Sequence, residues 1–136
     1  MKKYVLIASG GALGAVARIA VEHADVWNNG GTFPINTLLV NVSGSFVLAL
    51  VLALSLEILQ LDPAVRIGLS TGFLGAFTTF STFCKESVSM IDKGEYAAAA
   101  AYLFLSPALG LAAAFLGIVV AREVVKWKLP ASGEAK

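Results

Sequence analysis

Residues 72–85, GFLGAFTTFSTFCK, lie in the middle of a long apolar run and do not look like an ordinary membrane helix. They hold three glycine or alanine residues, four threonines or serines and four phenylalanines. A helix in lipid would normally carry leucine, isoleucine or valine here, and glycine and threonine are weaker helix formers. We therefore expect the helix to be interrupted in this segment. An interruption at membrane depth persists only where protein or an ion satisfies the freed peptide groups.

The composition around this segment is that of an integral membrane protein. The chain has 136 residues, of which 57% are hydrophobic and 14% are charged, whereas soluble domains carry about 25% charged residues. Four runs reach the roughly 20 residues that a helical span needs, at about 4–24, 35–60, 63–92 and 96–126. All four are predicted to be helices, because lipid does not satisfy open backbone groups and the alternation of a barrel strand is absent. The predicted fold is therefore all-α, with one transmembrane domain over residues 1–128 and a disordered tail at 129–136.

The chain has too few helices to enclose a wide pathway by itself, so we expect an oligomer. With four spans, both ends of the chain lie on one side of the membrane. That side carries seven of the ten lysines and arginines, which favours a cytoplasmic location for both ends. The apolar N-terminus resembles a signal peptide, but the run continues without a break and is interpreted as an uncleaved first helix.

Polar residues inside the apolar runs mark where function is expected, because lipid tolerates them only when they face protein or water. On the first run, Gly10, Gly14 and Arg18 recur every four residues. They form either a packing face with Arg18 reaching the membrane surface, or a vestibule where Arg18 attracts anions. On the second run, Thr37, Asn41 and Ser45 recur every four residues, with Gly44 on the same side, and the Asn41 amide offers two N–H donors. It either joins helices or donates to a small anion in a pore.

A similar stripe lies on the fourth run, where Tyr102, Ser106 and Gly110 follow one another at four-residue spacing. Pro107 removes a backbone donor and frees the carbonyl of Leu103. The stripe is either one face of a kinked packing helix or a track of hydroxyl groups along a pathway.

The third run carries the remaining candidate groups. The oxygens of a helix that is broken near Thr78 and Thr79 would suit a hard cation such as Na⁺. Phe80 and Phe83 share a helical face, which fits either helix packing or positive ring edges turned toward an anion. A full positive charge would hold an anion too tightly for it to leave.

Ser81 and Thr82 add hydroxyl donors beside these rings, and Glu86 follows one turn later. Glu86 is either a carboxylate close to a pore or a capping or interfacial carboxylate near the end of the helix. The one cysteine, Cys84, can form no internal disulfide and is interpreted as a small core side chain. The sequence shows no metal-spaced cluster, no phosphate-binding loop and no nucleophile with a base partner, so no enzyme is predicted.

Three motifs in order, GALGAVAR (11–18), NTLLVNVSGSF (36–46) and GFLGAFTTFSTF (72–83), resemble the Fluc, or CrcB, family of bacterial fluoride channels. The resemblance covers residues 4–126. It implies a four-helix subunit in the bacterial inner membrane that pairs antiparallel in the lipid, as a dual-topology homodimer. It also implies two fluoride pathways along the dimer interface, passive fluoride efflux and hence fluoride resistance.

The resemblance further implies roles for single residues. A structural Na⁺ would lie on the dyad, bound by the main-chain carbonyls of Gly75 and Thr78 from both subunits. Arg18 would lie in the vestibule. Gly110 departs from the family pattern, because some members carry a further hydroxyl at this position. Together with the donors noted above, the fluoride path is expected to contain Asn41, Phe80, Ser81, Thr82, Phe83, Glu86, Tyr102 and Ser106.

Two other functions remain open from the sequence. A small multidrug-resistance-type transporter is also short, four-helical and often inserted in both orientations, but it needs a carboxylate in the core of its first helix. Residues 4–21 contain no acidic side chain. A non-transporting assembly subunit is the third reading, and in that case substitutions at Phe80 or Asn41 would change no flux.

Overall fold

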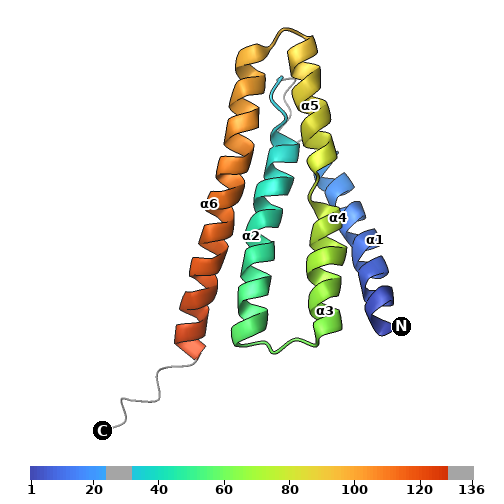
Figure 1. Cartoon of the computed structure of the whole chain (residues 1–136), viewed down its shortest axis with the longest axis vertical. Coiled ribbons are helices and arrows are strands. Elements are labelled where there is room, and N and C mark those ends of the chain that lie inside the picture. The colour runs from blue at the N-terminus through green and yellow to red at the C-terminus, as the bar shows by residue number, and fades with distance from the viewer. Residues whose placement is uncertain (24–31, 129–136) are drawn as a thin grey trace.

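The computed structural model describes residues 1–23 and 32–128, and this part of the chain is a bundle of helices without strands (Figure 1). The helical elements are α1 (Lys2–Glu22), α2 (Ile35–Glu57), α3 (Pro63–Ile67), η1 (Gly68–Leu74), α4 (Gly75–Phe77), α5 (Phe80–Asp92) and α6 (Tyr96–Lys128). With α3 to α5 counted as one stretch, four helical stretches are long and apolar enough to cross a membrane. The predicted all-α fold with four spans is confirmed. The tail expected to be disordered lies outside the described residues.

The connection between α2 and α3 is longer than expected, since α2 ends at Glu57 rather than near residue 60. Asp62 begins the next helix, because its Oδ1 accepts a hydrogen bond from the backbone N–H of Ala64 at 2.8 Å. The Nζ of Lys2 donates to Asp62 Oδ2 at 3.1 Å, which joins the start of α1 to this turn. These two hydrogen bonds hold the pKa of the Asp62 carboxyl below its ordinary value, and the bond from Lys2 has the larger effect.

α1 packs backbone against backbone on the first part of the third span, where its main contacts are with α3, η1 and α4 (Figure 1). A Cβ atom at Gly10 would lie 2.5 Å from the carbonyl oxygen of Gly68, and one at Gly14 would overlap the carbonyl oxygen of Phe73. Only glycine allows so close an approach. The glycine stripe of α1 is therefore a packing face, as one of the two interpretations expected.

The third span is interrupted in the segment that the sequence singled out. η1 is a π-helix, and after the single turn of α4 the chain becomes extended at Thr78 (φ −76°, ψ 154°) and Thr79 (φ −142°, ψ 120°). α5 then begins at Phe80, with the side chain of Thr79 as its N-cap. The predicted interruption is confirmed and lies between two threonines of low helix propensity.

α2 and α6 lie side by side and make the most extensive contact between two helices (Figure 1). α5 packs against α6, around a small core of Met90, Ala99 and Tyr102. The buried face of α5 carries Ser87 and Met90. Cys84 lies on another face of α5 and is exposed, so the interpretation of Cys84 as a core side chain is wrong.

Candidate functional site

The side chain of Asn41 on α2 braces the interruption of the third span. Asn41 Nδ2 donates to the carbonyl oxygen of Thr79 at 2.9 Å, and the backbone N–H of Thr79 donates to Asn41 Oδ1 at 2.8 Å. The two hydrogen bonds satisfy both peptide groups of an extended residue, as the interior of a bilayer requires. One N–H of the Asn41 amide is left over, and Asn41 lines a cavity of about 580 Å³.

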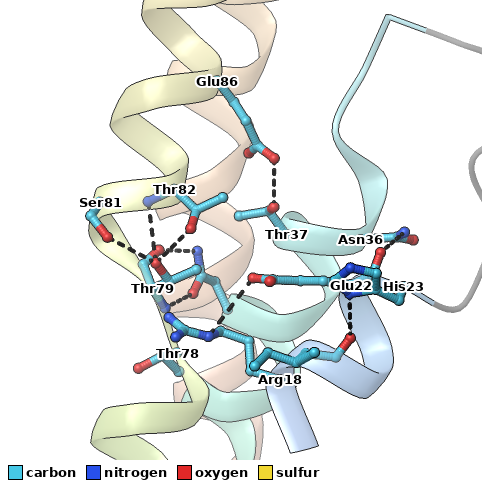
Figure 2. A network of polar contacts seen from close by, with 12 residues as sticks. Arg18, Glu22, His23, Asn36, Thr37, Thr78, Thr79, Ser81, Thr82 and Glu86 are labelled. Carbon is cyan, nitrogen blue, oxygen red and sulfur yellow. Dashed lines mark hydrogen bonds and ion pairs between the residues drawn. The ribbon is translucent and has the colours of Figure 1, made fainter. Parts of the chain in front are cut away.

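A hydroxyl cluster surrounds the first turn of α5 (Figure 2). Thr79 Oγ1 accepts from the backbone N–H of Thr82 at 3.2 Å and donates to Thr82 Oγ1 at 2.9 Å. Thr79 Oγ1 also lies 3.3 Å from Ser81 Oγ. Two of the predicted donors, Ser81 and Thr82, are thus held together by the N-cap residue, Thr79. Thr79 itself was not among the predicted site residues.

The same bonds leave two carbonyl groups without their usual helical partners. In an α-helix the carbonyl of Gly75 would accept from the N–H of Thr79, and the carbonyl of Thr78 from the N–H of Thr82. Here the N–H of Thr79 donates to Asn41, and that of Thr82 donates to the hydroxyl of Thr79. The carbonyl oxygens of Gly75 and Thr78 are therefore available as hydrogen-bond acceptors or as ligands of a hard cation.

Glu86 is held at the junction of three helices. Thr37 Oγ1 on α2 donates to Glu86 Oε1 at 2.8 Å (Figure 2), and the Tyr102 hydroxyl on α6 donates to Glu86 Oε2 at 2.8 Å. Both carboxylate oxygens are thus satisfied by neutral donors. The structure does not place Glu86 as a helix-capping group, which was part of the alternative interpretation. It brings Glu86 and Tyr102 together, while Thr37 was not among the predicted site residues.

Four aromatic rings form a continuous row beside this carboxylate. The ring centroids of Phe80 and Phe83 are 5.8 Å apart, those of Phe83 and Tyr102 5.0 Å, and those of Tyr102 and Phe33 5.4 Å. Phe80 is 78% exposed at one end of the row. Nothing in the spacing of the sequence indicated Phe33, which precedes α2 and reaches Tyr102 through the tertiary fold.

Three hollows lie along α2 and share Ser45 as a lining residue. The largest, of about 580 Å³, is lined by residues of α2, α5 and α6 that include Asn41, Ser45, Phe80, Phe83, Ser106 and Gly110. A hollow of about 500 Å³ shares Ser45 and Ala114 with it and continues to Glu57 and Arg122. A third, of about 230 Å³, reaches from Ser45 to Thr78 and Thr79. The predicted Asn41, Phe80, Phe83 and Ser106 therefore surround one space.

A separate polar cavity of about 310 Å³ lies beyond Glu86, lined by Thr32, Phe33, Pro34, Thr82, Lys85, Glu86, Ser89, Met90 and Lys93. Glu86 and Thr82 line this cavity, whereas Phe83 lines the larger one. The Glu86 junction thus lies between two hollows, with the aromatic row passing from one to the other.

Arg18 lies at the end of α1 and is paired on its own helix (Figure 2). Its Nε is 3.9 Å from Glu22 Oε1, and the Arg18 side chain is 27% exposed. The carbonyl oxygen of Glu22 also accepts from Asn36 Nδ2 at 3.1 Å, which ties α1 to the start of α2. Glu22 offsets part of the positive charge that Arg18 would offer to an anion.

Comparison with known proteins shows what this chain is similar to. Residues 5–118 match the model of the family described as CrcB-like protein, Camphor Resistance (CrcB). The fluoride-specific ion channel FluC of Acidobacterium capsulatum is 42% identical over 126 residues, which cover 90% of this chain and 98% of that protein. The FluC protein of Anaeromyxobacter dehalogenans is 44% identical over 123 residues, covering 90% and 97%. FluC 1 of Staphylococcus aureus is 39% identical over 116 residues, covering 85% and 93%.

Proposed function

Because the chain belongs to the CrcB family, we propose that it is a fluoride-specific ion channel, a multi-pass membrane protein that lets fluoride leave the cell passively. The observation that best supports this function is one cavity of about 580 Å³ that is lined by an amide, hydroxyls and aromatic rings. No charged side chain is among its lining residues. The alternatives of a multidrug transporter and an assembly subunit are set aside, since the relatives are named ion channels.

The chemistry of this lining suits a small, strongly hydrated anion. Fluoride gives up its water only to close hydrogen-bond donors, and the free N–H of Asn41 and the hydroxyl of Ser106 face the same cavity. Phe80 and Phe83 can offer the positive edges of their rings, which attract an anion without binding it permanently. A larger halide would gain less from close donors and would fit a narrow path less well.

The Glu86 carboxylate beside the proposed path is held in place by hydrogen bonds to both of its oxygens. Both of its oxygens accept from hydroxyl groups, those of Thr37 and Tyr102. These donors hold the carboxylate against α2 and α6. In the proposed path fluoride passes Glu86 along the row of rings, from the larger hollow to the polar cavity that Lys85 and Lys93 line.

We further propose that two copies of the chain pair antiparallel as a dual-topology homodimer in the lipid bilayer of the inner membrane. In one chain the wall of the large cavity is incomplete, and Phe80 is 78% exposed although it lines this cavity. A second copy on this side would cover Phe80 and close the path. Two copies related by a dyad would form two such paths.

The donor set at the interruption fits a structural Na⁺. The carbonyl oxygens of Gly75 and Thr78 lack their helical partners, and two symmetric copies would supply four such oxygens. Oxygen ligands of this kind suit a hard cation. A bound Na⁺ would supply a fixed positive field beside the fluoride paths, while Asn41 holds the extended residues that expose the carbonyls.

The function is tested by efflux from proteoliposomes that contain the purified chain and are loaded with either potassium fluoride or potassium chloride. With valinomycin present, we expect rapid fluoride efflux and slow chloride efflux, both followed with ion-selective electrodes. Comparable fluoride and chloride rates would contradict the proposed selectivity. Repeating the measurement in Na⁺-free medium tests the proposed cation, since fluoride efflux should then fall.

Two phenylalanine variants give a matched comparison for the path. Phe80 and Phe104 are exposed to a similar extent, 78% and 74%, but only Phe80 is among the residues that line the large cavity. We expect Phe80→Ile to slow fluoride efflux and Phe104→Ile to leave it near the level of the unmodified chain. Equal rates in the two variants would show that the ring of Phe80 does not act on fluoride.

A further inference from the structure

The hydroxyl stripe of α6 is incomplete at Gly110. Tyr102 and Ser106 carry hydroxyl groups one turn apart, and Gly110 follows after one more turn without a side chain. A Cβ atom placed at Gly110 would lie 3.6 Å from the Oγ of Ser45 on α2, and among the described residues no other side chain comes within 4 Å of it. The hydroxyl of Ser45 therefore occupies the space in front of Gly110.

Ser45 is also the residue that the three hollows along α2 share. It lines the cavity of about 580 Å³ with Asn41 and Ser106, the continuing hollow of about 500 Å³, and the one of about 230 Å³ that reaches Thr78. An ion that moved along α6 from Ser106 toward Arg122 would have to pass Ser45. This position is one turn beyond Asn41 on the same helix.

The hydroxyl of Ser45 is free to change its partner. Its Oγ donates to the carbonyl oxygen of Asn41 at 2.8 Å. That carbonyl lies within α2 and already accepts the helical N–H from one turn ahead. The hydroxyl can rotate toward the cavity without leaving a buried carbonyl unpaired, which is the usual behaviour of serines bonded back to their own helix.

We propose that Ser45 is an anion-binding residue of the path, which supplies from α2 the hydroxyl donor that α6 lacks at Gly110. The inference rests on the proposed function and adds one residue to the hydrogen-bond donors Asn41 and Ser106. Asn41, Ser106 and Ser45 then offer three neutral donors around one cavity, and Ser45 receives fluoride as it leaves the level of Ser106.

Ser43 provides the matched control on the same helix. Its Oγ also bonds back by one turn, to the carbonyl oxygen of Leu39 at 2.6 Å, but Ser43 is exposed and is absent from the lining of each described cavity. A change that acts only through the helix should affect Ser43 and Ser45 alike. A change that acts through the cavity should affect Ser45 alone.

The test compares initial fluoride efflux from proteoliposomes for the unmodified chain, Ser45→Ala, Ser45→Cys and Ser43→Ala. We expect Ser45→Ala to slow efflux by about tenfold, the effect of losing one hydrogen bond to an ion. Ser45→Cys, which keeps the size but donates weakly, should also be slow, and Ser43→Ala should be unchanged. The double variant Ser45→Ala/Gly110→Ser should recover most of the rate, because it returns a hydroxyl to the same space from α6.

Each outcome has a separate meaning. If the unmodified chain passes no fluoride, the proposed function fails and this assignment fails with it. If the unmodified chain passes fluoride but Ser45→Ala and Ser45→Cys match Ser43→Ala, only the assignment of Ser45 is overturned. A slow Ser45→Ala that Gly110→Ser does not rescue, in protein with an unchanged melting temperature, would also overturn it.

Discussion

Replacing Asn41 with alanine tests whether one side chain holds the interrupted span in place. The substitution removes the hydrogen bonds of 2.9 Å and 2.8 Å that satisfy the carbonyl and the N–H of Thr79. Each unmade bond to a buried peptide group costs about 1–3 kcal/mol. A loss of about 3 kcal/mol for the pair would raise the population of locally opened chain about 150-fold.

Hydrogen exchange measures this opening directly. In lipid nanodiscs, amide exchange followed by mass spectrometry should accelerate by about two orders of magnitude in peptides that contain Thr79. Ser43→Ala on the same helix is the control and should exchange like the unmodified chain. Asn41→Asp keeps the acceptor for the N–H of Thr79 but loses the donor to its carbonyl, so its exchange should be intermediate.

The result is independent of ion flux, which matters because Asn41 also lines the proposed path. Slow fluoride efflux in Asn41→Ala would follow from either role. Exchange at Thr79 that is equal in Asn41→Ala, Ser43→Ala and the unmodified chain would refute the argument that this amide braces the interruption.

Three further substitutions test the packing, the carboxylate junction and the surface turn. Gly14→Ala should strongly destabilise the chain, since its Cβ would overlap a backbone oxygen. A Cβ at Gly11 would lie 3.9 Å from its nearest neighbour, so Gly11→Ala should be close to neutral. Equal melting temperatures of the two variants in detergent would contradict this. Glu86→Gln leaves one of two hydroxyl donors without its oxygen acceptor, so the free energy of unfolding should fall by about 1–2 kcal/mol, and an unchanged value would show that the two bonds do not stabilise the fold. Because the pKa of Asp62 is lowered, its bond with Lys2 stabilises the chain at neutral pH, and this stabilisation is lost as the pH falls through that pKa. The melting temperatures of Asp62→Asn and the unmodified chain should therefore differ at pH 7 and converge in acid. A difference that persists in acid would contradict the assignment.

The spans and the interruption could be predicted from the sequence because they depend on local properties. Run length and hydropathy define the four spans, and the weak helix formers Thr78 and Thr79 mark the place where the third one breaks. The π-helix of η1 could not be foreseen, since it has no signature in these residue types. It lies where the backbone of α1 packs against the third span.

The contacts of the site were less predictable because they join residues far apart in the chain. Asn41 was recognised as a polar residue in an apolar run, but its bonds to Thr79 cross 38 positions. Glu86 was a candidate, yet only the fold brings Thr37 within 2.8 Å of it. The four-residue spacing placed Ser45 on the same helical face as Asn41, but its position beside Gly110 depends on the packing of α2 on α6, as does the contact of Phe33 with Tyr102.

The two extended threonines of the third span also divide the molecule mechanically. The portion from α3 to α4 is attached to α1, and α5 is attached to α6. We expect the third span to bend more easily at Thr78 and Thr79 than within a helix, because the regular series of helical hydrogen bonds does not continue across these extended residues. α2 and α6 are continuous helices, and α6 contains Pro107 within its length. The space between them and α5 is thus bounded by two continuous helices and by a third that begins at the interruption.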